Sequence, residues 1–472
     1  MPANPIDYTP STPKNEKGRW ITDGAWISGV VGVVTLISIA IICQRNYWLD
    51  RGVSLFNVIE FESQLDVKLF CLLVIAGSMC LTELIRLTLS GHKTLFTIAP
   101  QLKEGRYLDI LLTCVWRYFC YLILFYAVLF FYQAVPEYGM VNKSEYYQPW
   151  FRMFRWLFTA FIYLGFPYVL LTYVLKYDEN KDVNGYHHLV EKVLLGTLSK
   201  LKVIQWPESK RVSSAQLKKI FLGLLVRVFF MPLMTVFFIT QFSQLVSNFG
   251  YMFDWLPRHL ADGNYDHATF NKDMMNILKP IIFSIDVALA WCGYVITSRW
   301  IDNETQSTEP TLLGWFVCLI SYPPLQLAGL YFYFLSEDQI LNLQNDYFVT
   351  FFSVLMLCSF IFYTVATIVF GVRFSNLTHR GIIRTGPFAI IRHPAYTSKN
   401  IGWWLGIFPV LLYLYATGGA QFSFVLLSTI ALFAQSYWYY LRAITEERHL
   451  SVDPAYREYC ESVKYRFIPG VV

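Results

Sequence analysis

Charged residues are scarce in this chain. Asp, Glu, Lys and Arg make up only 15% of its 472 residues, while 55% are hydrophobic and 18% are aromatic. A soluble domain carries about 25% charged residues. The composition therefore argues against a soluble protein, and the net charge of +5 gives no reason to expect a nucleic-acid partner.

The chain also lacks the patterns that mark disulfide, metal and nucleotide sites. Its nine cysteines include no C-x-x-C pair, and most fall within apolar runs, where we expect small packing residues. The pair His187-His188 is interpreted as interfacial, with no Cys or carboxylate at ligand spacing, so no metal is predicted. Gly418-Gly419 follows no strand, which argues against a dinucleotide-binding loop and a Rossmann sheet.

Long apolar runs, by contrast, recur along the whole chain. About 20 mostly apolar residues cross the hydrocarbon core of a bilayer. The polar first 24 residues show no signal-peptide cleavage site, so we expect the first apolar run to remain in the mature protein. We predict an all-α, polytopic integral membrane protein with about ten transmembrane helices, at 25–43, 66–88, 108–133, 151–175, 220–248, 280–298, 310–335, 347–372, 401–415 and 421–440.

Lysine and arginine are distributed unevenly between the two sides of these helices. The segment 176–219 alone holds nine of them, and the loops on the same side as the termini are far richer in positive charge than the others. The positive-inside rule then predicts that both termini are cytoplasmic. A bacterial inner membrane is favoured, and an endoplasmic reticulum membrane also fits.

A polar stretch at 300–310 interrupts the apolar pattern after the sixth predicted helix. We interpret it as a connector between two regions. Residues 1–307 would form a six-helix region of unknown role, and residues 308–472 a four-helix region.

Several predicted helices contain ionisable residues, namely Glu83, Arg86, Arg117, Arg227 and Asp286. A charge at membrane depth is costly, so it marks either function or a pairing partner. Glu83 and Arg86 share a helical face and are expected to pair with each other. Asp286 has no opposite charge nearby in sequence, and a structural contact with a partner helix is favoured over a polar cavity.

Chemically useful residues gather in two segments of the last third, both predicted to be cytoplasmic. The first contains the sequences Gly386-Pro-Phe and Arg392-His393-Pro394-Ala-Tyr396. The second follows the last predicted helix and contains Glu446-Glu447 and, further on, Arg466.

This ordered combination resembles the isoprenylcysteine carboxyl methyltransferase and phospholipid methyltransferase superfamily over roughly residues 345–472. The resemblance implies S-adenosylmethionine as cofactor, bound within a helical bundle by His393, Tyr396, Glu446 and Glu447. The family usually has glycine where this chain has Ser398, and the N-terminal six-helix region has no counterpart in its smallest members.

The same residues offer the groups that S-adenosylmethionine requires. Its ammonium needs a carboxylate, which Glu446 or Glu447 supplies, and its carboxylate needs a donor such as Arg392 or His393. Its sulfonium tolerates an aromatic face such as that of Tyr396. Together with Pro394 in the motif, these residues form the predicted cofactor site.

The predicted methyl acceptor is a membrane-embedded lipid or a lipid-modified molecule, because a soluble acceptor gains nothing from ten helices. An acceptor carboxylate would need a cation to position it, and Arg466 or Arg384 would serve. An acceptor amine would need a base, for which Glu446 is the candidate. The sequence leaves both chemistries open.

Two other functions are also open. Residues 456–469 resemble the end of NADPH-dependent sterol reductases, but those enzymes carry Asn before the motif tyrosine and Gly-Asp after it, where this chain has Ala395 and Thr397-Ser398. A non-catalytic transporter would require charges near the bilayer midplane, for which the sequence offers Asp286.

Overall fold

Helices make up almost all the regular structure in the part of the chain that the computed structural model describes, which comprises residues 20–55, 59–90, 97–139, 141–178, 182, 184–201, 212–263, 265–325 and 337–471. The prediction of an all-α fold is confirmed. The helices are α1 (Trp26–Arg45), α2 (Trp48–Arg51), α3 (Gln64–Leu89), α4 (Pro100–Lys103), α5 (Tyr107–Ala134), α6 (Pro136–Gly139), α7 (Val141–Leu175), α9 (His187–Lys200), α10 (Ser214–Gly250), α11 (Leu256–Ala261), α12 (His267–Val295), α13 (Leu312–Leu319), α15 (Asp346–Phe370), α16 (Pro394–Ala416), α17 (Phe422–Leu450) and α18 (Pro454–Ser462).

Short strands form two antiparallel pairs within the described residues. One pair is β1 (Val53–Leu55) with β2 (Ile59–Phe61), and the other is β3 (Ser307–Thr308) with β4 (Thr378–His379). The second pair matters for the fold, because it joins the polar stretch after α12 to the loop after α15.

The described helices confirm a multi-pass membrane protein but not the count of ten. Eight are long and apolar enough to cross a bilayer, at Ile21–Arg45, Gln64–Leu89, Tyr107–Ala134, Glu145–Leu175, Ser214–Ala261, His267–Val295, Asp346–Arg373 and Phe422–Leu450.

The two remaining predicted helices differ from the expectation. The prediction of a continuous helix at 310–335 is wrong for the residues that are described. The helix α13 ends at Leu319, and a turn containing Pro323 and Pro324 follows. Proline lacks the backbone N–H that a continuing helix requires. The residues 326–336 lie outside the described part. The run predicted at 401–415 belongs to the longer α16, whose first turns are polar.

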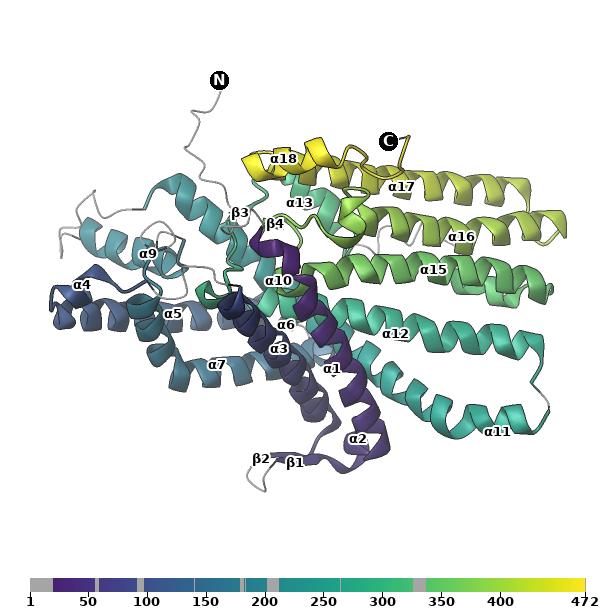
Figure 1. The fold of residues 1–472 in the computed structure, drawn as a ribbon, viewed down its shortest axis with the longest axis horizontal. Coiled ribbons are helices and arrows are strands. Elements are labelled where there is room, and N and C mark those ends of the chain that lie inside the picture. Colours follow the sequence, from purple (N-terminus) through teal and green to yellow (C-terminus); the bar gives the residue numbers. More distant parts are fainter. Residues whose placement is uncertain are drawn as a thin grey trace.

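The helices form a continuous assembly (Figure 1). On one side α12, α15, α16 and α17 lie next to one another in that order, and on the other side α5 contacts α7 and α9. Between them, α1, α3 and α10 pack around the largest buried apolar cluster. This arrangement brings the start of α16 next to the last turns of α17.

The two regions predicted from the sequence are in direct contact. Met356, Leu357 and Phe360 on α15 share a buried cluster with Met275 and Ile282 on α12. The connector is also packed into the fold rather than free. The separate roles of residues 1–307 and 308–472 stay a prediction.

Buried polar contacts tie these helices together. The amide of Asn303 in the connector is fully buried and donates to the carbonyls of Ile296 (2.8 Å) and Val372 (2.9 Å). Asp286 on α12 accepts hydrogen bonds from the hydroxyls of Tyr363 (2.6 Å) and Thr367 (2.8 Å) on α15. The expectation that Asp286 contacts a partner helix is confirmed.

The other intramembrane charges are partly paired. Arg86 donates two hydrogen bonds to Glu83, at 2.6 and 2.9 Å, which confirms the predicted pair. Arg117 forms an ion pair with Asp182. Arg227 has no such pair among the described residues.

Candidate active site

The loop before the Arg392-His393-Pro394 motif depends on one glycine. Gly386 has a φ angle of +61°, and a Cβ atom there would lie 2.8 Å from a methyl carbon of Val369. Only glycine adopts this conformation and fits this space without strain.

The motif itself forms the entry into α16. His393 directly precedes the helix, and Pro394 is its first residue, where the missing N–H of proline leaves no hydrogen bond unmade. The backbone N–H groups of Arg392 and His393 donate to the carbonyls of Tyr465 and Arg466, at 2.9 Å each. The motif is therefore fixed against the C-terminal tail, residues 463–471.

Glu447, near the end of α17, is the centre of the charge cluster. One carboxylate oxygen lies 3.1 Å from Nε2 of His393 and 3.2 Å from Nη1 of Arg392, and the other accepts from Nε of Arg466 at 2.8 Å. The side chain is only 8% exposed. A buried carboxylate is tolerated when it is paired and hydrogen-bonded, and Glu447 is surrounded by such partners.

Glu446 has a different environment, although it is the adjacent residue. Its side chain is 40% exposed, and it accepts a hydrogen bond from the hydroxyl of Tyr396 at 2.7 Å. Nδ1 of His393 lies 3.9 Å from it, and the rings of His393 and Tyr396 are stacked with centroids 5.3 Å apart. His393 thus lies between an enclosed carboxylate and an accessible one.

A buried arginine extends the cluster on its other side. The guanidinium of Arg442 lies 5.0 Å from the ring centre of Tyr396 and 5.6 Å from that of Tyr439, and donates to the amide oxygen of Asn376 at 2.8 Å. The sequence interpretation gave Arg442 no role. The signal was available, because Arg442 precedes Glu446 by four residues and so shares its helical face.

Arg384 is not brought into this cluster. It forms two hydrogen bonds of 2.9 Å with the carboxylate of Asp23, and its guanidinium lies 4.4 Å from the ring centre of Trp20. The hydrogen bonds to Asp23 raise the pKa of Arg384. Because a carboxylate of the chain itself already occupies this cation, the predicted role of Arg384 in positioning an acceptor is not supported by its contacts.

Ser398, at the position where the sequence resemblance leads one to expect glycine, fits the described packing. Its side chain is buried and donates to the carbonyl of Pro394 one turn earlier, while its own carbonyl accepts from the hydroxyl of Ser359 on α15 at 2.7 Å. A small hydroxyl residue is therefore accommodated where α16 approaches α15.

A small cavity adjoins the cluster, lined among others by Tyr396, Arg442 and Glu446. Its volume is about 50 Å³, well below the roughly 300–1,000 Å³ of ordinary ligand pockets. The charged and hydrogen-bonding groups of the cluster are of the types that S-adenosylmethionine requires, whereas the cavity is too small to hold it. Phe467 of the tail packs beside His393, and the side chain of Arg466 is 35% exposed.

The chain matches no protein-family model, no curated protein and no solved structure in three comparisons. A proposal for its function therefore rests on the residues and contacts described above.

One sequence interpretation outside the cluster is wrong. Glu191 follows His188 by three residues and lies 2.7 Å from its Nδ1, so a carboxylate is present at ligand spacing. His187, His188 and Glu191 bring ligand atoms within 4.8 Å of one another. They are also held by the chain itself, since Glu191 accepts from the indole of Trp116 at 2.7 Å.

Proposed function

We propose that this protein is an integral membrane methyltransferase that uses S-adenosylmethionine to methylate the polar group of a membrane-embedded lipid or lipid-modified molecule. One observation carries the proposal. Glu446 and Glu447, at the end of α17, meet Arg392, His393 and Tyr396, at the start of α16, although some fifty residues separate the two segments.

The unequal environments of the two glutamates suggest separate roles. Glu447 is already paired with two arginines and a histidine, so it would hold the basic groups in place. Glu446 is more exposed and would bind the ammonium group of the cofactor, with Tyr396 orienting it. Arg392 and Arg466 would bind the cofactor's or the acceptor's carboxylate through those guanidinium N–H groups that do not contact Glu447.

This assignment also narrows the acceptor. If Glu446 binds the cofactor's ammonium, it is not available as the base that an amine acceptor would need. A carboxylate acceptor needs only a cation, and Arg466 is the predicted candidate that lies in the cluster. S-adenosylmethionine would supply the electrophilic methyl group, while the chain would hold donor and acceptor in line and keep water out. We place the reaction at the cytoplasmic face, with both termini on that side.

The test uses membranes that contain the full chain. Incubation with S-adenosylmethionine carrying a radiolabelled methyl group, followed by organic extraction, should place label in the lipid phase. The same cofactor, and not NADPH, should raise the melting temperature of the detergent-purified protein. Stabilisation by NADPH alone would favour the reductase alternative, and label confined to a water-soluble product would contradict the lipid acceptor.

A further inference from the structure

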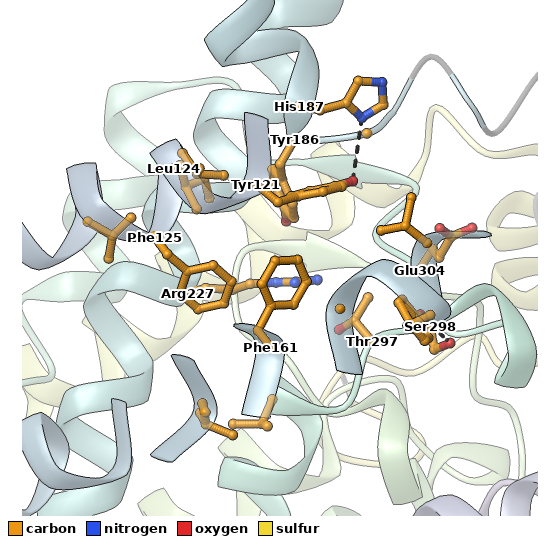
Figure 2. A pocket seen from close by; sticks show the side chains of 18 of the residues that line it. Tyr121, Leu124, Phe125, Phe161, Tyr186, His187, Arg227, Thr297, Ser298 and Glu304 are labelled. Carbon is orange, nitrogen blue, oxygen red and sulfur yellow. Dashed lines mark hydrogen bonds between the residues drawn. The ribbon is translucent and has the colours of Figure 1, made fainter. Parts of the chain in front are cut away.

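A second and much larger cavity lies between α5, α7, α10 and the end of α12 (Figure 2). Its volume is about 640 Å³, within the range of pockets that enclose small ligands. None of its lining residues belongs to the charge cluster around Glu447. It is therefore a separate feature, and it lies in the region that the sequence left without a role.

Most of the cavity wall is apolar and aromatic. Phe125, Phe154 and Phe161 line it, and Tyr132 and Trp150 line its far end. At about 1.5 Å per residue, the stretch of α5 from Arg117 to Tyr132 extends roughly 22 Å. The cavity is thus elongated along the helices, as an extended hydrocarbon chain would require.

The other end of the cavity is charged. Arg117 pairs with Asp182, and Arg299 lies 3.3 Å from Asp182 and 3.2 Å from Glu304. Burial, together with the neighbouring charges of His188, Arg117 and Arg299, lowers the pKa of His187 well below its ordinary value. His187 therefore adds no positive charge at neutral pH.

Arg227 is the exception among these charges. Its side chain lies among the lining residues in the middle of the cavity (Figure 2). Its Nε atom is buried without a hydrogen-bond partner, and no carboxylate pairs with it in the described part of the chain. Its close contact is the ring of Tyr186, 5.1 Å from the guanidinium carbon. The residue as a whole is half-buried. A cation at membrane depth without an anion is costly, and a bound anion would relieve that cost.

A second cation behind Arg227 strengthens this argument. Arg380 is buried and donates to the hydroxyl of Thr297, a residue that lines the cavity, at 2.8 Å. Burial and the charge of Arg227 lower the pKa of Arg380 to about 9. The two guanidinium groups therefore leave an excess of positive potential around Arg227.

We propose that this cavity binds a single-chain amphiphile with an anionic head group, with Arg227 binding the head group and the aromatic wall enclosing the chain. The ligand enters laterally from the bilayer. Leu164 on α7 lines the cavity and is 67% exposed, and Tyr168, one turn later, is 45% exposed. The site does not depend on methyl transfer, so its test is separate from that of the proposed function.

The experiment measures binding to delipidated, detergent-purified full-length protein. The probes share one hydrocarbon chain and differ in head group: oleate, oleoyl lysophosphatidate and oleyl alcohol, with inorganic phosphate as the head group alone. We expect one or both anionic amphiphiles to bind, at least tenfold more tightly than the alcohol, and phosphate not to bind measurably. Comparison of oleate with lysophosphatidate identifies the head group.

Three variants locate the site. Arg227→Gln should weaken binding of the anionic probe about tenfold or more, the loss expected for one charge-assisted hydrogen bond, while Arg227→Lys should retain part of the affinity. Val128→Trp should block the apolar end. Arg155→Gln, at an exposed arginine of α7 outside the lining, is the matched control.

Two results would overturn the proposal. One is equal affinity for the alcohol and the anionic probes. The other is unchanged affinity in both Arg227→Gln and Val128→Trp while the variants keep the wild-type melting temperature. Binding of S-adenosylmethionine should be the same in Arg227→Gln as in the wild type, so failure of this site and failure of the methyltransferase proposal are distinguishable.

Discussion

Two neighbouring glutamates show how strongly position on a helix decides the role of a residue. Successive residues of an α-helix point about 100° apart. Glu447 consequently faces the start of α16 and is enclosed by His393 and two arginines, whereas Glu446 faces Tyr396 and remains 40% exposed. Glu447 is thus enclosed by basic groups, whereas Glu446 is accessible from outside the cluster.

Substitution of the two glutamates should therefore have different effects. Glu446→Gln should weaken binding of S-adenosylmethionine by roughly 1.5–3 kcal/mol, the contribution of one charge-assisted hydrogen bond, with little change in melting temperature. Glu447→Gln should lower the melting temperature as well, because it removes the counter-ion of buried basic groups, at a cost of about 3 kcal/mol. Calorimetry and thermal unfolding measure the two effects. Glu461→Gln, at an exposed position of α18, is the control, and identical behaviour of the two cluster variants would contradict this division.

The sequence predicted the cluster better than its surroundings. Arg392, His393, Tyr396 and the two glutamates do come together, because both segments flank helices that lie side by side. The ion pair of Arg384 could not be predicted from the sequence, because its partner Asp23 lies some 360 residues away. A long-range ion pair of this kind leaves no local pattern in the chain.

At the level of helices, hydropathy predicts that a membrane helix is present more reliably than it predicts where that helix begins and ends. Apolar runs located each of the eight long apolar helices found in the described part of the chain. The prediction at 310–335, however, did not take account of two adjacent prolines, and the prediction at 401–415 missed the polar first turns of α16. Which helices pack against each other is still harder to predict from the sequence. Asp286 had no visible partner in sequence, yet α12 and α15 pair through its contacts with Tyr363 and Thr367.

The contact between α12 and α15 can be tested as a double-mutant cycle. Asp286→Ala and Tyr363→Phe should each destabilise the protein, and the double variant should be less destabilised than the sum of the two. Polar contacts between membrane helices contribute about 0.6 kcal/mol on average and at most about 1.7, so we expect a coupling in that range. Ser243→Ala on α10 is a control, since its hydroxyl bonds within its own helix. Strict additivity would show that the contact does not couple the helices.

For the molecule as a whole, the N-terminal region provides part of the framework that supports the site. Arg373, directly after α15, is 1% exposed and lies 3.7 Å from the fully buried carboxylate of Glu83 on α3. It also donates to the carbonyl of Asp302 in the connector at 2.7 Å. The loop that follows Arg373 leads through β4 to the Arg392 motif. The cluster thus depends on helices that the sequence assigned to another region.

Residues 308–472 expressed alone should consequently fail to bind S-adenosylmethionine. Removal of the first 307 residues takes away Glu83 and leaves the buried cation of Arg373 unpaired, which costs about 3–5 kcal/mol. It also removes the α12 face against which α15 packs. Co-expression with residues 1–307 should restore binding, because the same contacts can form between two chains. The measurement is the shift in melting temperature on addition of the cofactor. Within the full chain, Glu83→Gln should reduce stability by a comparable amount, whereas Glu104→Gln, at an exposed residue before α5, should not. A fragment of residues 308–472 that the cofactor stabilises as much as it stabilises the full chain would contradict this dependence and show that the C-terminal region is an independent unit.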